Sequence, residues 1–414
     1  MIFARRQEEM MAEHYIKSIK INEVRHLTGI EIKLNKTERQ HLILTGKNGS
    51  GKTSVLRALK SYLQAINDGK LNILKGQYQQ WYNDDFKKYN NAKSDIEKYK
   101  AQSELEKDIG FIKKYDQGAT ISFANEEELD FVYAQGNFIT AFFPADRKSL
   151  FQRVNGAQDV KLENQYSIGA EPSKILLKYM VHLKTQQAYA KNENDPEVEA
   201  SIATWFLRFE NALKVLLGEE SIRLVYDYKN YNFIIEQKGR NSYSLDELSD
   251  GYSAIIGIVS DLILRMDNNW LLRGKISQYD VEGIVLIDEL ETHLHVELQR
   301  KILPFLTKFF PRIQFVITTH SPYILNSISN ACIYDLEKRV QFMDFSAYSA
   351  GEIAEAYLDA ETYSDEIKRK AERYEILKGK GNLTEEERAE RAQLRIELKS
   401  ANAVFGKFEE EKKL

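Results

Sequence analysis

A glycine-rich segment near the start of the chain carries the residue types that bind a triphosphate. In the pattern G-x-x-x-x-G-K-[ST], glycines let backbone N–H groups face a phosphate, the lysine neutralises the β- and γ-phosphates, and the hydroxyl ligates Mg²⁺. A strand-like run precedes the segment and an amphipathic helical pattern follows it, which makes a chance match the weaker interpretation. The segment predicts a site for ATP and Mg²⁺ formed by Gly46, Lys47, Asn48, Gly49, Ser50, Gly51, Lys52, Thr53 and Ser54.

An acidic pair, Asp288 and Glu289, directly follows the apolar run 284–287. A strand of consecutive apolar residues is typical of a parallel sheet buried on both faces. At its tip, Asp288 is placed to reach Mg²⁺ through water. Glu289 leaves the strand on the other side, toward the γ-phosphate, and is the candidate general base for an attacking water. Such a pair is common by itself, but after this glycine-rich segment it predicts hydrolysis of ATP.

His320 and the pair Ser249 and Gly251 are further candidates. His320 follows a second apolar run, at the edge of the sheet where ligands bind in α/β proteins, and we expect it to contact the γ-phosphate; the alternative is a structural histidine. Ser249 and Gly251 begin a long apolar helix. Ser249 could simply cap this helix. The functional interpretation is that the helix N-terminus faces a nucleotide held by another subunit.

The spacing of apolar residues predicts an α/β chain. Paired antiparallel strands are expected within 15–34, 222–237 and 331–345, and single strands at 41–45, 119–123, 129–133, 138–143, 283–287 and 313–318. Helices are expected at 53–66, 173–190, 196–217, 249–266, 296–309 and 322–327. The four parts that we expect are 1–66 with the phosphate-binding loop, a helical insertion at 67–117, the rest of the nucleotide-binding unit at 118–350, and a charged helical tail at 351–414.

Composition narrows the class of protein. The chain has 414 residues, of which 43% are hydrophobic and 29% charged, and a net charge of −4. The protein as a whole therefore does not carry the positive charge that would attract nucleic acid, although one basic face would suffice to bind DNA. No apolar stretch predicts a membrane helix or a signal peptide, and the single cysteine, Cys332, excludes an internal disulfide framework. A cytoplasmic protein is the simplest expectation.

Together these motifs resemble the ABC-type ATPase heads of the SMC, RecF and OLD-like group. Residues 248–252 are similar to the signature motif, with Asp250 and Tyr252 where transporters usually show Gly and Gln. Residues 291–295 resemble the string that follows the acidic pair in OLD-like, RecF-like and anti-phage ATPases. Residues 318–325 resemble the segment that carries the switch histidine in the same group. Residues 143–147 are similar to a proline–acid–arginine element of that group. The resemblance covers about 15–345 without the insertion, and we assign no Q-loop glutamine.

The resemblance implies an ABC-type P-loop ATPase head with a mostly parallel core sheet and an antiparallel β-subdomain. It also implies a homodimer, because in this group ATP is held between one P-loop and the signature segment of a second subunit, here Ser249 and Gly251. ATP would close the dimer, and hydrolysis through Glu289 would reopen it. Assembly beyond the dimer is left open.

The function most consistent with the resemblance is the sensor or scaffold ATPase of an anti-phage defence system, acting with a separate effector such as a nuclease. A DNA repair or maintenance ATPase of the RecF or SMC type is the main alternative. A transporter subunit is disfavoured because Lys52 and Ser249 are 249 − 52 = 197 positions apart, more than in compact transporter heads. A self-contained nuclease is disfavoured because the tail shows no clustered acids on strands. A nucleotide-gated scaffold without DNA contact stays open.

Overall fold

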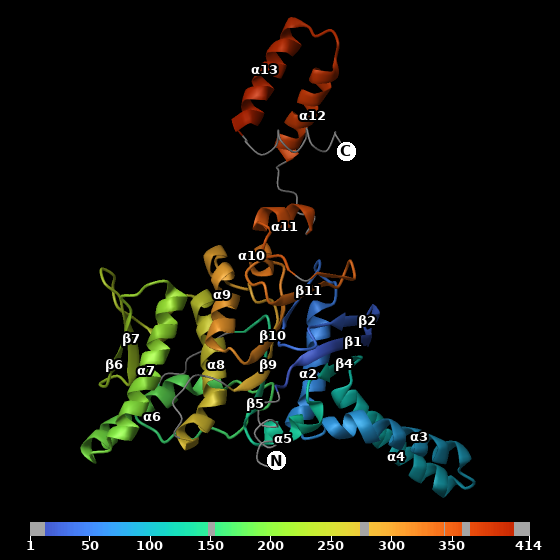
Figure 1. Cartoon of the computed structure of the whole chain (residues 1–414), viewed down its shortest axis with the longest axis vertical. Helices are drawn as coiled ribbons and strands as arrows, with labels where there is room; N and C mark the ends of the chain where they lie inside the picture. The colour runs from blue at the N-terminus through green and yellow to red at the C-terminus, as the bar shows by residue number, and fades with distance from the viewer. Residues whose placement is uncertain (1–12, 148–153, 274–280, 343, 358–364, 401–414) are drawn as a thin grey trace. The chain divides into compact units, whose positions relative to one another are not determined.

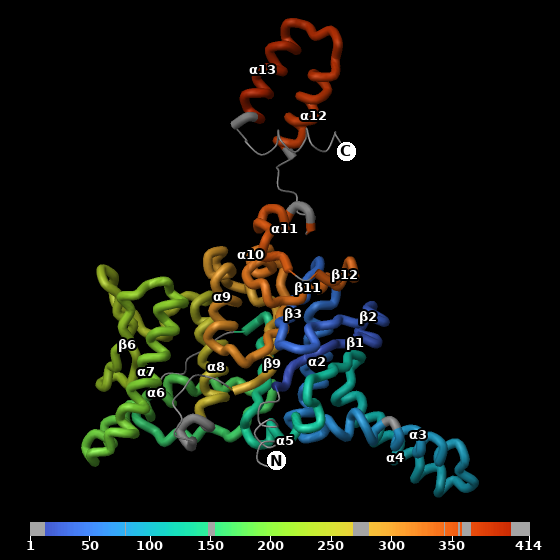
Figure 2. Tube along the Cα trace, in the orientation of Figure 1, coloured from blue at the N-terminus to red at the C-terminus, as the bar shows by residue number. Residues whose placement is uncertain are grey.

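The structure is a computed structural model that describes residues 13–147, 154–273, 281–342, 344–357 and 365–400. Figure 2 draws the other residues in grey. The chain divides into two compact units, Met1–Ser349 and Ala350–Leu414. Among the described residues, no helix combines the length and the apolar character needed to cross a membrane.

A six-stranded sheet lies at the centre of the first unit (Figure 1). The strand order is β12-β11-β3-β10-β9-β5, and all neighbours are parallel except β11 and β12. Every residue of β3, β9 and β10 is buried, as expected for parallel strands covered on both faces. The strands are β3 (His41–Thr45), β5 (Phe138–Phe143), β9 (Glu282–Ile287), β10 (Ile313–Thr318), β11 (Ala331–Asp335) and β12 (Val340–Phe342).

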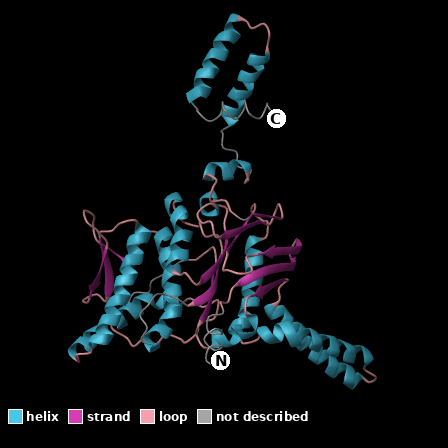
Figure 3. Ribbon diagram, viewed as in Figure 1, coloured by secondary structure: helices cyan, strands magenta, loops and turns pink. Residues whose placement is uncertain are grey.

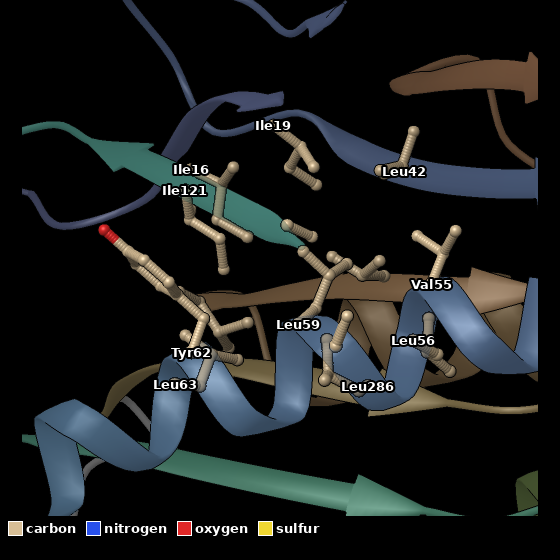
Figure 4. Packing of buried hydrophobic residues seen from close by; sticks show 14 of the residues in the cluster. Ile16, Ile19, Leu42, Val55, Leu56, Leu59, Tyr62, Leu63, Ile121 and Leu286 are labelled. Carbon is tan, nitrogen blue, oxygen red and sulfur yellow. The ribbon is translucent and has the colours of Figure 1, made fainter. Parts of the chain in front are cut away.

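Helix α2 (Lys52–Asn67) connects the glycine-rich segment to the main core. Its apolar side packs between the central sheet and an antiparallel sheet of order β2-β1-β4, in one hydrophobic cluster with Leu286 of β9. Figure 4 shows Leu59 and Tyr62 of α2 pointing toward Ile19 and Ile121 of that second sheet. This packing on two sides fixes the N-terminus of α2. The second sheet consists of β1 (Ile16–Val24), β2 (Leu27–Lys33) and β4 (Ala119–Phe123).

Long helices separate the central sheet from a small third sheet of order β6-β7-β8 (Figure 1). An aromatic cluster fills this region: Trp205 stacks on Phe209 with 5.5 Å between ring centroids, and Phe206 stacks on Phe233 of β7 at the same separation. The elements are α6 (Leu176–Asn192), α7 (Pro196–Leu217), β6 (Arg223–Asp227), β7 (Asn232–Glu236), β8 (Tyr243–Ser244), α8 (Asp250–Arg273), α9 (Val296–Phe309) and α10 (Pro322–Leu325), with short turns η3 (Pro172–Ile175) and η4 (Leu245–Glu247).

The predicted helical insertion is a hairpin of α3 (Tyr78–Asn91) and α4 (Asp95–Tyr115), preceded by the π-helical turn η1 (Ile73–Gln77). Figure 3 shows it extending from the rest of the first unit. At its base, the Tyr115 hydroxyl donates to Asp68 over 2.7 Å. At its tip, the Ser94 side chain accepts from the Glu97 N–H over 3.2 Å and caps α4, which stabilises the helix start.

The strand expected at 129–133 is wrong, because these residues form helix α5 (Leu129–Ala134) after the turn η2 (Glu126–Glu128). Leu129 and Tyr133 are buried while Phe131 between them is 67% exposed. That spacing of four positions places both buried side chains on one helical face. The other expected fold features are confirmed: an α/β chain with a mostly parallel core sheet, an antiparallel β-subdomain, a helical insertion and a charged helical tail.

The second unit contains α11 (Ala350–Ala356), α12 (Asp365–Gly379) and α13 (Glu385–Ser400). Helices α12 and α13 pair through a small core in which Ala371 and Leu398 are buried. Arg373 donates to both carboxylate oxygens of Glu390, each over 2.9 Å. Since this ion pair is exposed, the apolar contacts are the main attraction between the two helices.

A buried carboxyl in α8 predicts a pH-dependent stability. The Trp205 Nε1–H donates to Asp267 over 2.6 Å, and burial raises the pKa of Asp267 to about 7. Because the folded-state pKa lies above the unfolded value, this group stabilises the protein fully at low pH and progressively less as pH rises toward 7. Asp267→Asn keeps the acceptor and removes the ionisation. We expect the unfolding free energy of the variant relative to the natural protein to rise by about 2 kcal/mol between about pH 5.5 and about pH 8. Urea unfolding of both proteins at the two pH values measures this difference. The same change of unfolding free energy with pH in both proteins would contradict the prediction.

Candidate functional site

The glycine-rich segment is a tight loop between β3 and α2. Gly46, Gly49 and Gly51 have φ of 129°, 85° and 97°, which side-chain-bearing residues rarely adopt. At Gly46 there is also no room, since a Cβ would lie 2.9 Å from Ser50 Oγ. The Ser50 N–H donates to the Lys47 carbonyl over 3.1 Å and closes the turn.

The remaining loop residues differ in exposure. Lys47, Asn48 and Gly49 are exposed, Gly46 and Ser50 are buried, and Ser54 is half-buried in the first turn of α2. Lys47 is held outward by Glu337, 3.3 Å from its Nζ. The loop thus has the left-handed glycines and the helix N-terminus of a phosphate-binding loop.

Lys52 lies folded against the loop. Its ammonium donates to the carbonyls of Gly46 over 2.8 Å and Lys47 over 3.1 Å, and the residue is only 5% exposed. Burial lowers the pKa of Lys52, and surrounding carboxylates raise it in turn, chiefly those of Glu289 and Glu291. The cation is therefore placed between the loop and the acidic residues that follow β9.

Thr53, Asp288 and Thr318 meet where α2 begins and where β9 and β10 end. The Thr53 hydroxyl donates to Asp288 Oδ1 over 3.2 Å, and the Thr318 hydroxyl donates to the same oxygen over 2.7 Å. Asp288 is 2% exposed. Because β9 and β10 are parallel neighbours, their carboxyl ends lie at one edge, and Asp288 comes into contact with Thr53, which lies 235 positions earlier in the chain (288 − 53 = 235).

These oxygens suit Mg²⁺ better than a metal that needs many protein ligands. No group of three or more His, Cys, Asp or Glu side chains with metal-binding geometry occurs within the described ranges. Mg²⁺ is usually held by one or two protein oxygens and completes its shell with water and substrate phosphates. The Thr53 hydroxyl and the Asp288 carboxylate fit that donor set.

Glu289 has an unusual backbone conformation. Its φ is 45°, in the left-handed region that is unfavourable for a residue with a side chain. Its N–H donates to the Thr318 hydroxyl over 2.7 Å, and its carboxylate accepts from the Thr292 hydroxyl over 3.3 Å. Glu289 is half-buried, so its carboxylate keeps partial access to solvent, and its charge acts on Lys52.

His320 follows β10 at the same edge. Its backbone N–H donates to Glu291 Oε1 over 2.5 Å. Its Nε2 is buried and has no hydrogen-bond partner among the described residues. Burial and the nearby Lys52 ammonium lower the pKa of His320. An imidazole nitrogen that no described residue contacts by a hydrogen bond leaves a place for a ligand atom.

Ser249 directly precedes α8, and Gly251 lies in the first turn of this helix. Ser249 is exposed, and its carbonyl accepts from the Ser253 N–H over 2.9 Å as the first bond of the helix. Gly251 is buried, and a Cβ there would lie 2.4 Å from the His293 carbonyl oxygen. Gly251 thus permits close packing of α8 on the segment after β9 of its own chain. Because Ser249 is exposed and Gly251 is buried, Ser249 is the residue that a second molecule can contact.

Arg147 also belongs to this site, although the sequence did not assign it a contact. Its guanidinium donates to the carbonyls of Asp288 over 2.8 Å, Glu289 over 3.2 Å and Leu290 over 3.0 Å. The sequence signal was the proline–acid–arginine element at 143–147. Only the fold shows that β5, which precedes this element, is the parallel neighbour of β9.

Comparison with a family model places residues 72–326 in the family described as "AAA domain, putative AbiEii toxin, Type IV TA system". The matched part begins after the glycine-rich loop and contains the acidic pair and His320.

Three named relatives are similar to the chain. Septu protein PtuA of Bacillus mycoides (strain KBAB4) is 27% identical over 321 residues, covering 76% of this chain and 39% of the relative. Retron Vc95 probable ATPase of Vibrio cholerae serotype O1 biovar El Tor is 24% identical over 431 residues, covering 85% of this chain and 81% of the relative. Retron Ec83 probable ATPase of Escherichia coli is 37% identical over 109 residues, covering 26% of this chain and 20% of the relative. The chain thus spans well under half of the first and third of these relatives.

Solved structures of similar fold include an Smc head bound to the C-winged helix domain of ScpA, with a TM-score of 0.37, 12% identity, and coverage of 78% of this chain and 93% of that chain. CbiO1 from Clostridium perfringens, part of the ABC transporter complex cbiONQ, has a TM-score of 0.36 and 11% identity and covers 82% and 94%. Both scores are low, and the fold given above rests on this chain's own topology.

Proposed function

Because the chain belongs to this AAA-domain family, we propose that it binds ATP with Mg²⁺ and hydrolyses it to ADP and phosphate. One observation carries the proposal: the hydrogen bond between Thr53 and Asp288 joins the glycine-rich loop to the acidic pair at one sheet edge. Two motifs that are far apart in the sequence thereby form a single site with a cation, Lys52, beside it.

In the proposed site, loop N–H groups and Lys52 hold the phosphates, and Thr53 and Asp288 hold Mg²⁺. Mg²⁺ would neutralise charge on the β- and γ-phosphates. Glu289 takes a proton from the attacking water, and His320 contacts the γ-phosphate through its Nε2. The expected water-activating role of Glu289 fits a carboxylate that is half-buried rather than fully enclosed, since a water can reach it.

Phosphate release by the purified protein tests this activity. With ATP and Mg²⁺ we expect steady release of phosphate, and none when EDTA removes the metal. Protein that binds ATP and Mg²⁺ but releases no phosphate, alone or with DNA present, would contradict hydrolysis.

ATP would also join two copies of the chain. Ser249 is exposed at the start of α8, where free N–H groups and the helix dipole favour a phosphate. A two-fold dimer would place this end of α8 opposite the loop of the second copy and create two equivalent sites. Gly251 contributes by allowing α8 to pack on the segment that carries Glu289.

The biological role that we favour is a nucleotide-dependent sensor or scaffold in anti-phage defence, acting with a separate effector such as a nuclease. Its support is the likeness to proteins named Septu PtuA and retron ATPases. A DNA repair or maintenance ATPase remains the alternative. Nucleotide-dependent retention of DNA by the protein alone, without any effector, would favour that alternative. Because the defence role requires an intracellular effector, a cytoplasmic location belongs to this proposal.

A groove between α7 and α9 suits the effector. It has a volume of about 910 Å³, and its floor is apolar, with Leu216, Ile302 and Phe305 among the buried residues. None of the described residues that line it is acidic, whereas four are basic: Arg208, Arg300, Lys301 and Lys308. An apolar floor with a basic rim fits an acidic amphipathic helix of the effector.

Reversing two rim charges tests this surface. We expect a synthetic acidic amphipathic helix of leucines and glutamates to bind the natural protein at least about tenfold more tightly than Lys301→Glu/Lys308→Glu, because opposite charges would become like charges. Fluorescence anisotropy of the labelled peptide gives both affinities. Lys100→Glu/Lys113→Glu on the exposed side of α4 is the matched control. Equal binding of a leucine–lysine peptide would contradict the assignment, as would a second copy of the chain covering the groove.

A further inference from the structure

Three consecutive carbonyls after β9 converge on one side chain. The Nη1 of Arg147 donates to Asp288 and its Nη2 donates to Glu289 and Leu290, over 2.8 to 3.2 Å. Nη1 also donates to the Pro144 carbonyl over 3.3 Å. A planar guanidinium has five N–H donors in a fixed fork, so it can satisfy several carbonyls at once. A lysine ammonium on its flexible side chain does not fix its N–H donors in such a planar arrangement.

The middle carbonyl of the three belongs to the residue with the strained backbone. Glu289 has a φ of 45°, and this conformation is unfavourable for a residue other than glycine. Such strain persists only where the surroundings hold it. Here the Glu289 N–H is held by the Thr318 hydroxyl and the Glu289 carbonyl by Arg147. The peptide groups on both sides of the residue are therefore fixed.

The two restraints come from the strands that flank β9. Thr318 ends β10, and Arg147 follows β5, whose register with β9 pairs Phe143 with Ile287. The Asp288 N–H donates to the Phe143 carbonyl over 2.8 Å, and the Leu290 N–H donates to the Thr318 carbonyl over 3.1 Å. The backbone on either side of Glu289 is thus hydrogen-bonded to residues of the neighbouring strands, although β9 itself ends at Ile287.

Arg147 also balances charge. The site contains the carboxylates of Asp288, Glu289 and Glu291, all of which favour the charged guanidinium, although burial lowers the pKa of Arg147 to about 10. The guanidinium therefore remains charged at neutral pH. It contacts the acidic segment from the backbone side and leaves the carboxylate of Glu289 free for Thr292 and for a ligand.

We propose that Arg147 is a positioning residue, which holds Glu289 in its left-handed conformation and so aims the Glu289 carboxylate at the attacking water. This rests on the proposed ATP hydrolysis. Without the guanidinium, the Glu289 peptide relaxes toward an ordinary conformation and the carboxylate points elsewhere. The phosphate-binding loop does not contact Arg147 through any of these bonds, so ATP binding is unaffected.

Two substitutions separate positioning from general support of the fold. Arg147→Met keeps a long side chain and removes every donor; Arg147→Lys keeps the charge and restores a donor. We expect Arg147→Met to lower kcat at least about tenfold, in line with the usual contribution of an aligned general base, with the Kd for a fluorescent ATP analogue within about twofold of the natural value. Arg147→Lys is expected to recover part of kcat. Arg395→Met, at an exposed arginine of α13, is the control and should match the natural protein.

The outcomes distinguish this inference from the proposed function. A natural protein that releases no phosphate overturns the ATPase itself. Phosphate release at the natural rate by Arg147→Met overturns only the role of Arg147. A parallel loss of ATP affinity and kcat also overturns it, because Arg147 would then support the whole site. If Arg147→Met does not fold, Arg147→Lys decides: an unchanged kcat contradicts positioning, and a lower kcat with unchanged Kd supports it.

Discussion

Glu289→Gln is expected to bind ATP normally and to release phosphate about 10²–10⁴-fold more slowly than the natural protein, the usual range for loss of a general base. Glutamine has nearly the same shape and can still accept from the Thr292 hydroxyl, but it cannot take a proton from water. Since hydrolysis would reopen the dimer, ATP-bound dimers should accumulate. Single-turnover phosphate release and light scattering after size-exclusion chromatography measure the two effects.

Glu193→Gln, at an exposed glutamate after α6, is the control and should behave as the natural protein does. Normal turnover by Glu289→Gln would remove Glu289 from the role of base. Slow turnover without dimers would keep the chemistry and reject the coupling of ATP to assembly.

Lys52→Ala is expected to weaken ATP binding by about 100-fold or more, because charge-assisted hydrogen bonds to phosphate contribute roughly 1.5–3 kcal/mol each. Lys52 is the buried cation of the loop, held against the Gly46 and Lys47 carbonyls. Its removal leaves the carboxylates of Asp288, Glu289 and Glu291 without this neighbouring charge. Isothermal titration calorimetry with ATP and Mg²⁺ gives the affinity.

Thermal unfolding without nucleotide is the companion measurement for Lys52→Ala, because the lysine also lies within an acidic cluster. A folded variant with near-natural ATP affinity would contradict the assignment of the loop. The matched control is Lys113→Ala, at an exposed lysine of α4 away from the loop; its ATP affinity should match that of the natural protein.

Local patterns in the sequence were sufficient to predict most of this fold and the individual motifs. Fully apolar runs predicted the buried strands β9 and β10, and the glycine spacing predicted a loop whose φ values require glycine. The 129–133 segment failed because apolar residues at both ends suit a strand or one helical turn, and the tertiary contacts of Leu129 and Tyr133 select the helix. The division into 1–66, 67–117, 118–350 and 351–414 stays a prediction.

What the sequence could not supply was contact across long separations. Arg147 was visible only as part of a short element, and its hold on Glu289 depends on the parallel pairing of β5 with β9. The nucleotide contact expected of Gly251 stays a prediction, and its packing on the His293 carbonyl, which the sequence did not indicate, follows from the approach of α8 to its own chain. The basic groove combines α7 with α9, whose facing residues share no sequence pattern.

The most direct measurement is the structure of Glu289→Gln with ATP and Mg²⁺ bound. The account predicts two copies of the chain around two nucleotides, with the γ-phosphate of each contacted by Ser249 from the opposite copy and with Thr53 and Asp288 on the same Mg²⁺. A nucleotide bound to a single copy, with the start of α8 of every other copy far from the γ-phosphate, would contradict it.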